Sequence, residues 1–262
     1  MLLTINNLAI SFQLDRSIIT AVKGVSFDIA KGETVVLAGE SGSGKTITAL
    51  GITKILPPRA TIDSGEVSFE GKNISALGEE GLRKIRGVQI GYIFQEPTTY
   101  LNPLFTIGYQ IMEPIILHRG STKKEAYRHA ASLLEQTQFK EPDKIMASYP
   151  HQLSGGMNQR AFIAMSLACT PKLLIADEPT TALDVTIESA ILELLARLKE
   201  EFGFALLFIT HNLSIAKKIA DRIIIMYKGR IVESGSKAEV FNAPKHLHTQ
   251  QLIKAYELIG KI

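Results

Sequence analysis

The segment Gly39-Glu40-Ser41-Gly42-Ser43-Gly44-Lys45-Thr46 constrains this sequence more than any other. It fits the pattern G-x-x-x-x-G-K-[ST], in which glycines let the backbone wrap a phosphate group and the lysine reaches its outer oxygens. The apolar run 34–38 before the segment predicts a strand, and residues 47–56 after it predict a helix that stops at Pro57-Pro58. A chance Gly/Ser-rich turn lacks these flanks, so the sequence predicts a phosphate-binding loop.

The composition is that of an ordinary globular protein: 262 residues, 45% apolar and 21% charged. A net charge of +3 gives no electrostatic reason to expect nucleic-acid binding. Cys169 is the single cysteine, which excludes an intrachain disulfide, and we expect it to be a small buried hydrophobe. The sequence shows no secretory signal and no uncharged apolar run of the ~20 residues needed to span a bilayer. Work at a membrane would therefore go through partner chains.

Short apolar runs alternate with helical patterns, which predicts an α/β fold with a mainly parallel sheet. The best helix is 185–202, with Asp184 placed to cap its start and Gly203 to end it. Alternating patterns at 2–12 and 22–29 predict an N-terminal antiparallel β subdomain. The remaining predicted strands are 90–94, 173–176 and 205–209, with a closing hairpin of 223–227 and 230–233 around Lys228-Gly229.

Strand signals disappear between Gln95 and Ser154, and helical signals take over from about Thr106. Thr122 and Glu125 form a capping box at the start of one predicted helix. Its narrow apolar stripe consists of Ala126, Ala130, Leu133 and Leu134. We therefore expect an α-helical subdomain of about 96–159, inserted into a nucleotide-binding domain of 1–238, and a weakly helical tail of 239–262.

A second motif is the apolar run 173–176 followed by Asp177 and Glu178. Two adjacent carboxylates at the end of a buried strand are costly unless a cation or a reaction uses them. In phosphate-loop NTPases an aspartate in this place holds Mg²⁺. The pair predicts a magnesium ligand, Asp177, next to Glu178, a residue that orients or deprotonates the attacking water.

A third motif narrows the class. Residues 153–160, LSGGMNQR, resemble the LSGGQ signature peptide of ABC ATPases. Ser154, Gly155 and Gly156 open a predicted helix, and a helix N-terminus of this kind binds anions. The resemblance implies a phosphate-loop ABC ATPase core that hydrolyses ATP with Mg²⁺. It also implies that ATP lies between the phosphate loop of one subunit and the signature of another.

Other positions match the same family, and together the matches cover nearly all of the first 235 residues. Gln95 resembles the Q-loop glutamine, which contacts Mg²⁺ and water, and Asp184 in Thr181-Ala182-Leu183-Asp184 resembles the D-loop aspartate at the dimer interface. His211 resembles the H-loop histidine that contacts the γ-phosphate, and Phe12 the A-loop aromatic that stacks on adenine.

The resemblance thus predicts three sets of site residues. The catalytic set is Glu178, His211 and Gln95, and the metal set is Thr46, Gln95 and Asp177. The nucleotide-binding set is Phe12, Gly39, Ser41, Gly42, Ser43, Gly44, Lys45, Thr46, Ser154, Gly155, Gly156 and Asp184.

Longer stretches such as GESGSGKT and YPHQLSGGMNQRAF are similar to the peptide/nickel importer branch, and Met157 resembles the first of its two ATPase subunits. The implied assembly has a second homologous ATPase, as a heterodimer with a homodimer as the alternative, two integral membrane permeases and an external binding protein. The chain would lie at the cytoplasmic face of the inner membrane, held there by the permeases. Its cargo would be oligopeptides or dipeptides, with nickel or a metal chelate as the alternative.

The tail departs from the branch pattern P-x-H-P-Y-T. Residues 244–249 read PKHLHT, which keeps the proline, the first histidine and the threonine. The tail has no cysteine, so no iron–sulfur cluster is expected. His246 and His248 lack a third metal ligand, which favours an ordinary surface tail.

Two other classes stay open as alternatives. A non-transport ABC ATPase that acts on DNA or ribosomes would carry a long coiled coil or two cassettes, and neither pattern occurs here. A regulatory module that binds ATP without hydrolysing it would not need both Glu178 and His211.

Overall fold

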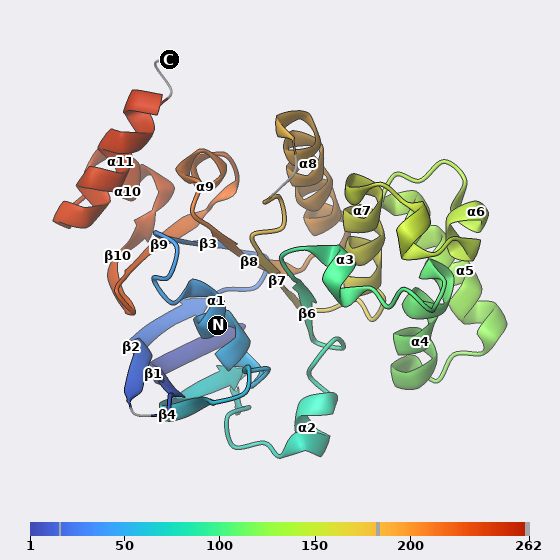
Figure 1. Cartoon of the computed structure of the whole chain (residues 1–262), viewed down its shortest axis with the longest axis horizontal. Coiled ribbons are helices and arrows are strands. Elements are labelled where there is room, and N and C mark those ends of the chain that lie inside the picture. The colour runs from blue at the N-terminus through green and yellow to red at the C-terminus, as the bar shows by residue number, and fades with distance from the viewer. Residues whose placement is uncertain (16, 182–183, 260–262) are drawn as a thin grey trace. The chain divides into compact units, whose positions relative to one another are not determined.

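The computed structural model describes residues 1–15, 17–181 and 184–259 (Figure 1). The chain forms two compact units, residues 1–82 with 205–262 and residues 83–204.

The first unit contains an antiparallel sheet in the strand order β2-β1-β4-β5. Its inward positions are apolar and buried, as Leu3, Ile5 and Ile10 show, and this alternation is what confines one face of an antiparallel sheet to the core. The antiparallel subdomain expected from the sequence is therefore present. The strands are β1 (Leu3–Gln13), β2 (Ile18–Ile29), β4 (Ala60–Phe69) and β5 (Lys72–Asn73).

The same unit contains the parallel strands that carry the phosphate loop. β3 (Thr34–Ala38) pairs in parallel with β8 (Ala205–Thr210) on one side and β9 (Arg222–Tyr227) on the other. Every residue of β3 is buried, as expected for an apolar strand between two neighbours. β10 (Arg230–Ser236) pairs antiparallel with β9 across Lys228 and Gly229, which both have positive φ. The predicted hairpin is confirmed.

Charged groups hold the N-terminal ends of β3 and β9 together. Arg222 donates from Nε to Glu33 Oε1 at 2.8 Å and contacts Asp28 Oδ2 at 3.2 Å. Burial raises the pKa of Glu33, but hydrogen bonds from Arg222 and from the Ala30 N–H, with the charge of Arg222, outweigh it and hold the pKa below the ordinary value. The ionised cluster therefore joins β2, β3 and β9 at neutral pH.

In the second unit, β6 (Ile90–Ile93) and β7 (Leu173–Asp177) pair in parallel and are wholly buried. α7 (Gly155–Ser166) packs on β6, and the Ser166 hydroxyl donates to the Tyr92 carbonyl at 2.6 Å. Cys169 is 7% exposed and burial raises the pKa of its thiol, which confirms the prediction of a buried small hydrophobe.

α8 (Val185–Phe202) has the predicted bounds and caps. Asp184 Oδ1 accepts from the Ile187 N–H at 2.9 Å, and Gly203 ends the helix in the left-handed conformation.

Only helices lie between Gln95 and Ser154. The Thr122–Glu125 capping box is present in both directions, and all four residues of the predicted apolar stripe are buried. The compact unit that holds these helices also includes β6, β7 and α8, so the limits of 96–159 for the insert and of 1–238 for the domain remain predictions. The elements are α3 (Pro97–Tyr100), α4 (Ile107–Arg119), α5 (Lys123–Gln136), α6 (Pro142–Ala147) and the 3₁₀ turn η1 (Pro150–Gln152).

One predicted helix was inaccurate in its limits. The helix after the phosphate loop, α1, ends at Ile52 rather than residue 56, because Lys54 adopts φ 56°, outside the helical region. The tail forms two definite helices that pack near α9 (Figure 1). The helices not yet given are α1 (Lys45–Ile52), α2 (Glu79–Arg83), α9 (Leu213–Ile219), α10 (Lys237–Asn242) and α11 (Leu247–Ile259).

Across the described ranges, no helix combines the length and the apolar character that crossing a bilayer requires.

Candidate functional site

The phosphate loop connects β3 to α1 in a conformation that depends on its glycines. Gly39 has φ 152°, and a Cβ there would lie 2.2 Å from the Met226 carbonyl oxygen. Gly44 has φ 103° and is the N-cap of α1, and a Cβ there would lie 2.7 Å from the Ala21 carbonyl oxygen. Only glycine fits either position. The pattern G-x-x-x-x-G therefore has a steric cause in this chain.

Lys45 is the cation of this loop. The residue is 5% exposed, and its ammonium donates to the carbonyls of Gly39 at 2.8 Å and Glu40 at 2.9 Å. Ser43 Oγ is buried without a hydrogen-bond partner among the described residues. Ser41, Gly42 and Thr46 are exposed. The exposed rim, the buried cation and the N-terminus of α1 form a cradle suited to an anion.

His211 follows β8 at the edge of the sheet where the loop begins. Thr210 is the register partner of Ala38, so His211 and Gly39 leave neighbouring parallel strands at the same level. His211 is exposed. Phe12 is half-buried near the end of β1, opposite Ile19 and Ala60. Both residues belong to the unit that contains the phosphate loop.

In the second unit, the same edge rule brings Gln95 near the acidic pair. Ile93 and Ala176 are register partners in β6 and β7, so the residues that follow them leave the sheet at the same edge. Asp177 is 6% exposed, and Gln95 is exposed. Glu178 has φ 45°, a conformation rare for residues other than glycine, and accepts from the Thr181 hydroxyl at 2.9 Å. Such local strain is concentrated at functional sites.

The signature residues start α7. Ser154 is the N-cap, and its Oγ accepts from the Met157 N–H at 3.4 Å, while Gly155 is exposed. A Cβ on Gly156 would lie 3.2 Å from Ile187 in the first turn of α8. Since Asp184 caps that turn, the structure brings the predicted signature and Asp184 together.

The predicted site residues thus fall into two groups, each inside one unit. Ala182 and Leu183, which precede Asp184 in the expected D-loop, lie outside the described residues. The roles assigned to the site residues remain predictions. The first group is Phe12, Gly39 to Thr46 and His211, and the second is Gln95, Ser154, Gly155, Gly156, Asp177, Glu178 and Asp184.

One tail prediction is wrong. His248 is not on the surface: it is 6% exposed and stacks on Tyr227 with ring centroids 3.8 Å apart. The Oε1 atom of Glu40 lies 4.0 Å from the Nε2 atom of His248. The described residues contain no cluster of three metal-ligating side chains. The sequence offered no signal for this burial, because it depends on tertiary contacts with Tyr227 and Glu40 that no local pattern reveals.

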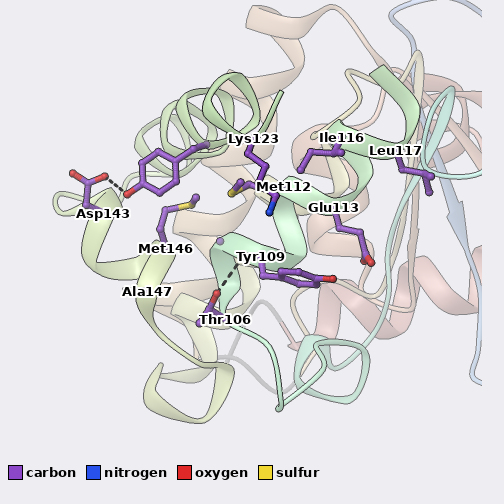
Figure 2. A pocket seen from close by; sticks show the side chains of 12 residues that line it. Thr106, Tyr109, Met112, Glu113, Ile116, Leu117, Lys123, Asp143, Met146 and Ala147 are labelled. Carbon is purple, nitrogen blue, oxygen red and sulfur yellow. Dashed lines mark hydrogen bonds between the residues drawn. The ribbon is translucent and has the colours of Figure 1, made fainter. Parts of the chain in front are cut away.

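A groove of about 730 Å³ on the helical segment was also missed. Figure 2 shows side chains from α4, α5 and α6 around it, among them Tyr109, Met112 and Met146. Tyr109 is 49% and Leu117 72% exposed. The Tyr127 hydroxyl donates to Asp143 at 2.8 Å at one end. Large exposed apolar side chains that gather at a groove are common at interaction surfaces.

The fold and the loop between β3 and α1 define a phosphate-loop nucleotide-binding cassette. A profile of the ABC transporter family matches residues 22–181. The dimeric ATP-binding cassette MJ0796, solved in a post-hydrolysis state with ADP and Pi, resembles this chain with a TM-score of 0.80 and 32% identity, over 90% of this chain and 98% of that one.

Two curated proteins extend this likeness. The peptidoglycan transport ATP-binding protein YejF of Agrobacterium fabrum is 51% identical over 97% of this chain, which spans 47% of YejF. The oligopeptide transport ATP-binding protein AppD of Bacillus subtilis is 47% identical over 98% of this chain, which spans 79% of AppD. The chain belongs to the ABC transporter family. This confirms the expected cassette fold and, at the level of the family, the expected ATPase.

Proposed function

We propose that this chain is the ATP-hydrolysing subunit of an importer whose cargo is a peptide. The observation that carries the proposal is the likeness to transport ATP-binding proteins over 97–98% of this chain, two of them named for peptidoglycan and oligopeptide. The phosphate loop, with Lys45 buried beneath an exposed rim, supplies the chemistry such a subunit needs. Nickel or a metal chelate is the alternative cargo.

ATP would enter the phosphate loop. The backbone N–H groups of the loop and the N-terminus of α1 face the phosphates, and Lys45 exchanges its two carbonyl partners for phosphate oxygens. Phe12 stacks on the base, and His211 contacts the γ-phosphate. Glu178, held by Thr181, orients the attacking water and takes its proton.

Magnesium fits the donors that this chain offers. Thr46 brings a hydroxyl, Gln95 an amide oxygen and Asp177 a carboxylate, all hard oxygen ligands of the kind that Mg²⁺ prefers. When bound, the ion would neutralise charge on the phosphates. Thr46 and Gln95 are exposed, so their oxygens are accessible to an ion that arrives with the nucleotide.

The signature residues would act on a nucleotide held by a second ATPase subunit. Ser154 and Gly155 are exposed at the N-terminus of α7, where a helix attracts an anion. The related cassette bound to ADP and Pi is a dimer. The partner is a second homologous ATPase, with two copies of this chain as the alternative arrangement.

The groove on α4, α5 and α6 is our proposed contact with a membrane subunit, which would hold the chain at the cytoplasmic face of the membrane. An apolar helical segment fits its exposed Tyr109 and Leu117, and the exposed carboxylate of Glu113 at its rim would attract a basic residue on that segment. Leu117→Ser should release the chain from its membrane subunits while ATP binding persists. Leu247→Ser, at an equally exposed leucine outside the groove, should have no effect.

The deciding experiment reconstitutes the chain with its membrane subunits, partner ATPase and external binding protein in vesicles. Peptide-loaded binding protein should stimulate ATP hydrolysis and peptide uptake. Stimulation by nickel or a metal chelate instead would select the alternative cargo. ATP hydrolysis stimulated by DNA or ribosomes, with no association with the membrane subunits, would refute the transport role.

A further inference from the structure

The C-terminal tail returns to the phosphate loop through one buried histidine. His248 lies in the first turn of α11, and its ring stacks on Tyr227 at 3.8 Å with an interplanar angle of 28°. Tyr227 ends β9, whose Ile225 pairs with Ala38 directly before the loop. His248 therefore packs against the strand that supports the phosphate loop from one side.

Backbone hydrogen bonds of the tail fix the position of His248. Glu233 in β10 accepts from the N–H groups of Lys245 at 2.8 Å and His246 at 3.0 Å. His246 Nδ1 then accepts from the His248 N–H at 3.2 Å. Lys245 and His246 are thus tied to β10, and His248 is tied to His246, which sets the direction of the His248 side chain.

The Nε2 atom of His248 has no hydrogen-bond partner among the described residues, although it is buried. An unsatisfied buried N–H is unfavourable, and each case in a native structure calls for a reason. The facing carboxylate belongs to Glu40 in the phosphate loop, with Oε1 4.0 Å from Nε2. Glu40 has a side chain 58% exposed to solvent, so it can rotate to close the remaining distance.

Glu40 also contacts the cation of the loop through its backbone. Its carbonyl accepts from Lys45 Nζ at 2.9 Å and from the Ser43 N–H at 3.2 Å. A bond that holds the Glu40 side chain therefore limits where this carbonyl, and with it the ammonium of Lys45, can lie. His248 does not have to touch the nucleotide to influence its binding.

We propose that His248 is a positioning residue for ATP binding: its Nε2–H donates to the Glu40 carboxylate and thereby holds the phosphate loop and Lys45 in the nucleotide-accepting arrangement. This inference rests on the proposed role of the phosphate loop. It assigns the tail a function that its helical pattern did not indicate, namely to fasten the loop from the C-terminal side.

The charges around His248 come from three segments. Burial lowers its pKa below the ordinary value of 6.5, the Glu40 carboxylate opposes that shift, and His246 and Lys228 add to it. Tyr227 offers a ring face and not a charge. The imidazole is therefore neutral at neutral pH, and acid turns its bond to Glu40 into an ion pair.

The test separates the hydrogen bond that His248 donates from the stacking of its ring on Tyr227. His248→Phe keeps an aromatic ring for Tyr227 and removes the donor, whereas His248→Gln keeps an N–H donor at similar reach and removes the ring. ATP affinity of the full chain is measured by titration calorimetry, with thermal melting as the check on folding. We expect about fivefold weaker binding for His248→Phe, the effect of one hydrogen bond, and near wild-type binding for His248→Gln.

Glu40→Ala removes the acceptor by truncating an exposed side chain, so it provides a second variant that folds independently of the tail packing. It should weaken ATP binding by a similar factor. The double variant His248→Phe/Glu40→Ala should bind no more weakly than either single variant, because each substitution removes the same interaction. The coupling between the two sites should grow only when the pH falls below 6.5, the ordinary histidine value, because burial lowers the pKa at which His248 takes up a proton.

The opposite pattern overturns the proposal: wild-type affinity for His248→Phe with weak binding for His248→Gln shows that only ring packing matters. Additive effects that do not depend on pH also contradict it. Lys45→Ala distinguishes this failure from a failure of the site itself. If Lys45→Ala keeps wild-type affinity, the phosphate loop is wrongly placed. If Lys45→Ala loses ATP affinity and His248→Phe does not, only the proposed role of His248 is refuted.

Discussion

Two helices in this chain begin where an anion could bind, and their first turns differ. At the start of α1, Lys45 is buried and bonded to two loop carbonyls, and Gly39 and Gly44 are in close contact with neighbouring backbone. At the start of α7, Ser154 caps the helix through a long bond of 3.4 Å, and a Cβ on Gly155 would meet nothing within 4 Å.

The difference indicates what each helix start can do alone. A cradle with its own cation and packed walls can hold a triphosphate in a single chain. A helix start with an open face and a polar cap provides dipole and hydrogen bonds, which are weak in water until another surface excludes solvent. We therefore expect variants of α1 to change ATP binding by the isolated chain, and variants of α7 to change only the assembled motor.

The largest expected effect follows from Lys45→Ala. The cradle loses its cation, and charge-assisted bonds contribute about 1.5–3 kcal/mol each, so ATP affinity should fall by about 100-fold or more. Titration calorimetry on the isolated chain measures this. Lys31→Ala removes an equal charge from an exposed site and serves as the control. Unchanged affinity for Lys45→Ala would remove the basis of the comparison.

Glu178→Gln should be next in size. Glutamine matches the glutamate in volume and can keep the Thr181 contact, so the fold and ATP binding should survive. It cannot take a proton from water, and hydrolysis should fall by about 100-fold, with ATP trapped in the closed assembly. The assay mixes the chain with its partner ATPase and resolves turnover at each site.

Glu200→Gln, on the exposed surface of α8, is the matched control and should hydrolyse ATP normally. Wild-type turnover at the site that contains the Glu178→Gln substitution would show that another group prepares the water. Continued turnover only at the second site would leave the assignment intact.

Local patterns predicted the strand that precedes the phosphate loop and the helix α8. The apolar run 34–38 and the helix 185–202 match β3 and α8 residue for residue, because burial on both sides and capping at both ends are visible in the sequence. Asp177 extends β7 by one residue beyond the predicted strand. Contacts between distant segments were not predictable: Glu40 and His248 look unrelated until β9 and α11 bring them together.

The conformation of single residues was equally hidden. Nothing in the sequence distinguishes Glu178, with φ 45°, from Asp177 before it. Tyr109 and Leu117, both in α4, line the groove on α4, α5 and α6 and are exposed rather than packed in the core. Helical periodicity locates the buried face of a helix and gives little information on what binds to its exposed face.

Phe12→Ala should have a smaller effect, and like Lys45→Ala it should change ATP binding by the isolated chain. Phe12 is half-buried in β1, and loss of its ring should weaken ATP binding by about tenfold, since one stacking face contributes about 1–3 kcal/mol. GTP binding should weaken by a similar factor, because stacking discriminates little between bases. A large change in the ratio of ATP to GTP affinity would replace stacking with hydrogen-bonded recognition of the base.

Ser154→Ala should have the smallest effect on the isolated chain and therefore tests the comparison most sharply. The lost cap should cost about 1 kcal/mol of unfolding free energy or less, since its bond to the Met157 N–H is long. ATP affinity of the isolated chain should not change, whereas hydrolysis by the assembly should fall because the partner's nucleotide loses a hydroxyl contact. Thr122→Ala removes the cap of α5 in the same unit and should cost at least as much stability. Slower hydrolysis for Ser154→Ala but not for Thr122→Ala would separate nucleotide contact from helix stability, and equal losses would mean that α7 acts only as a scaffold.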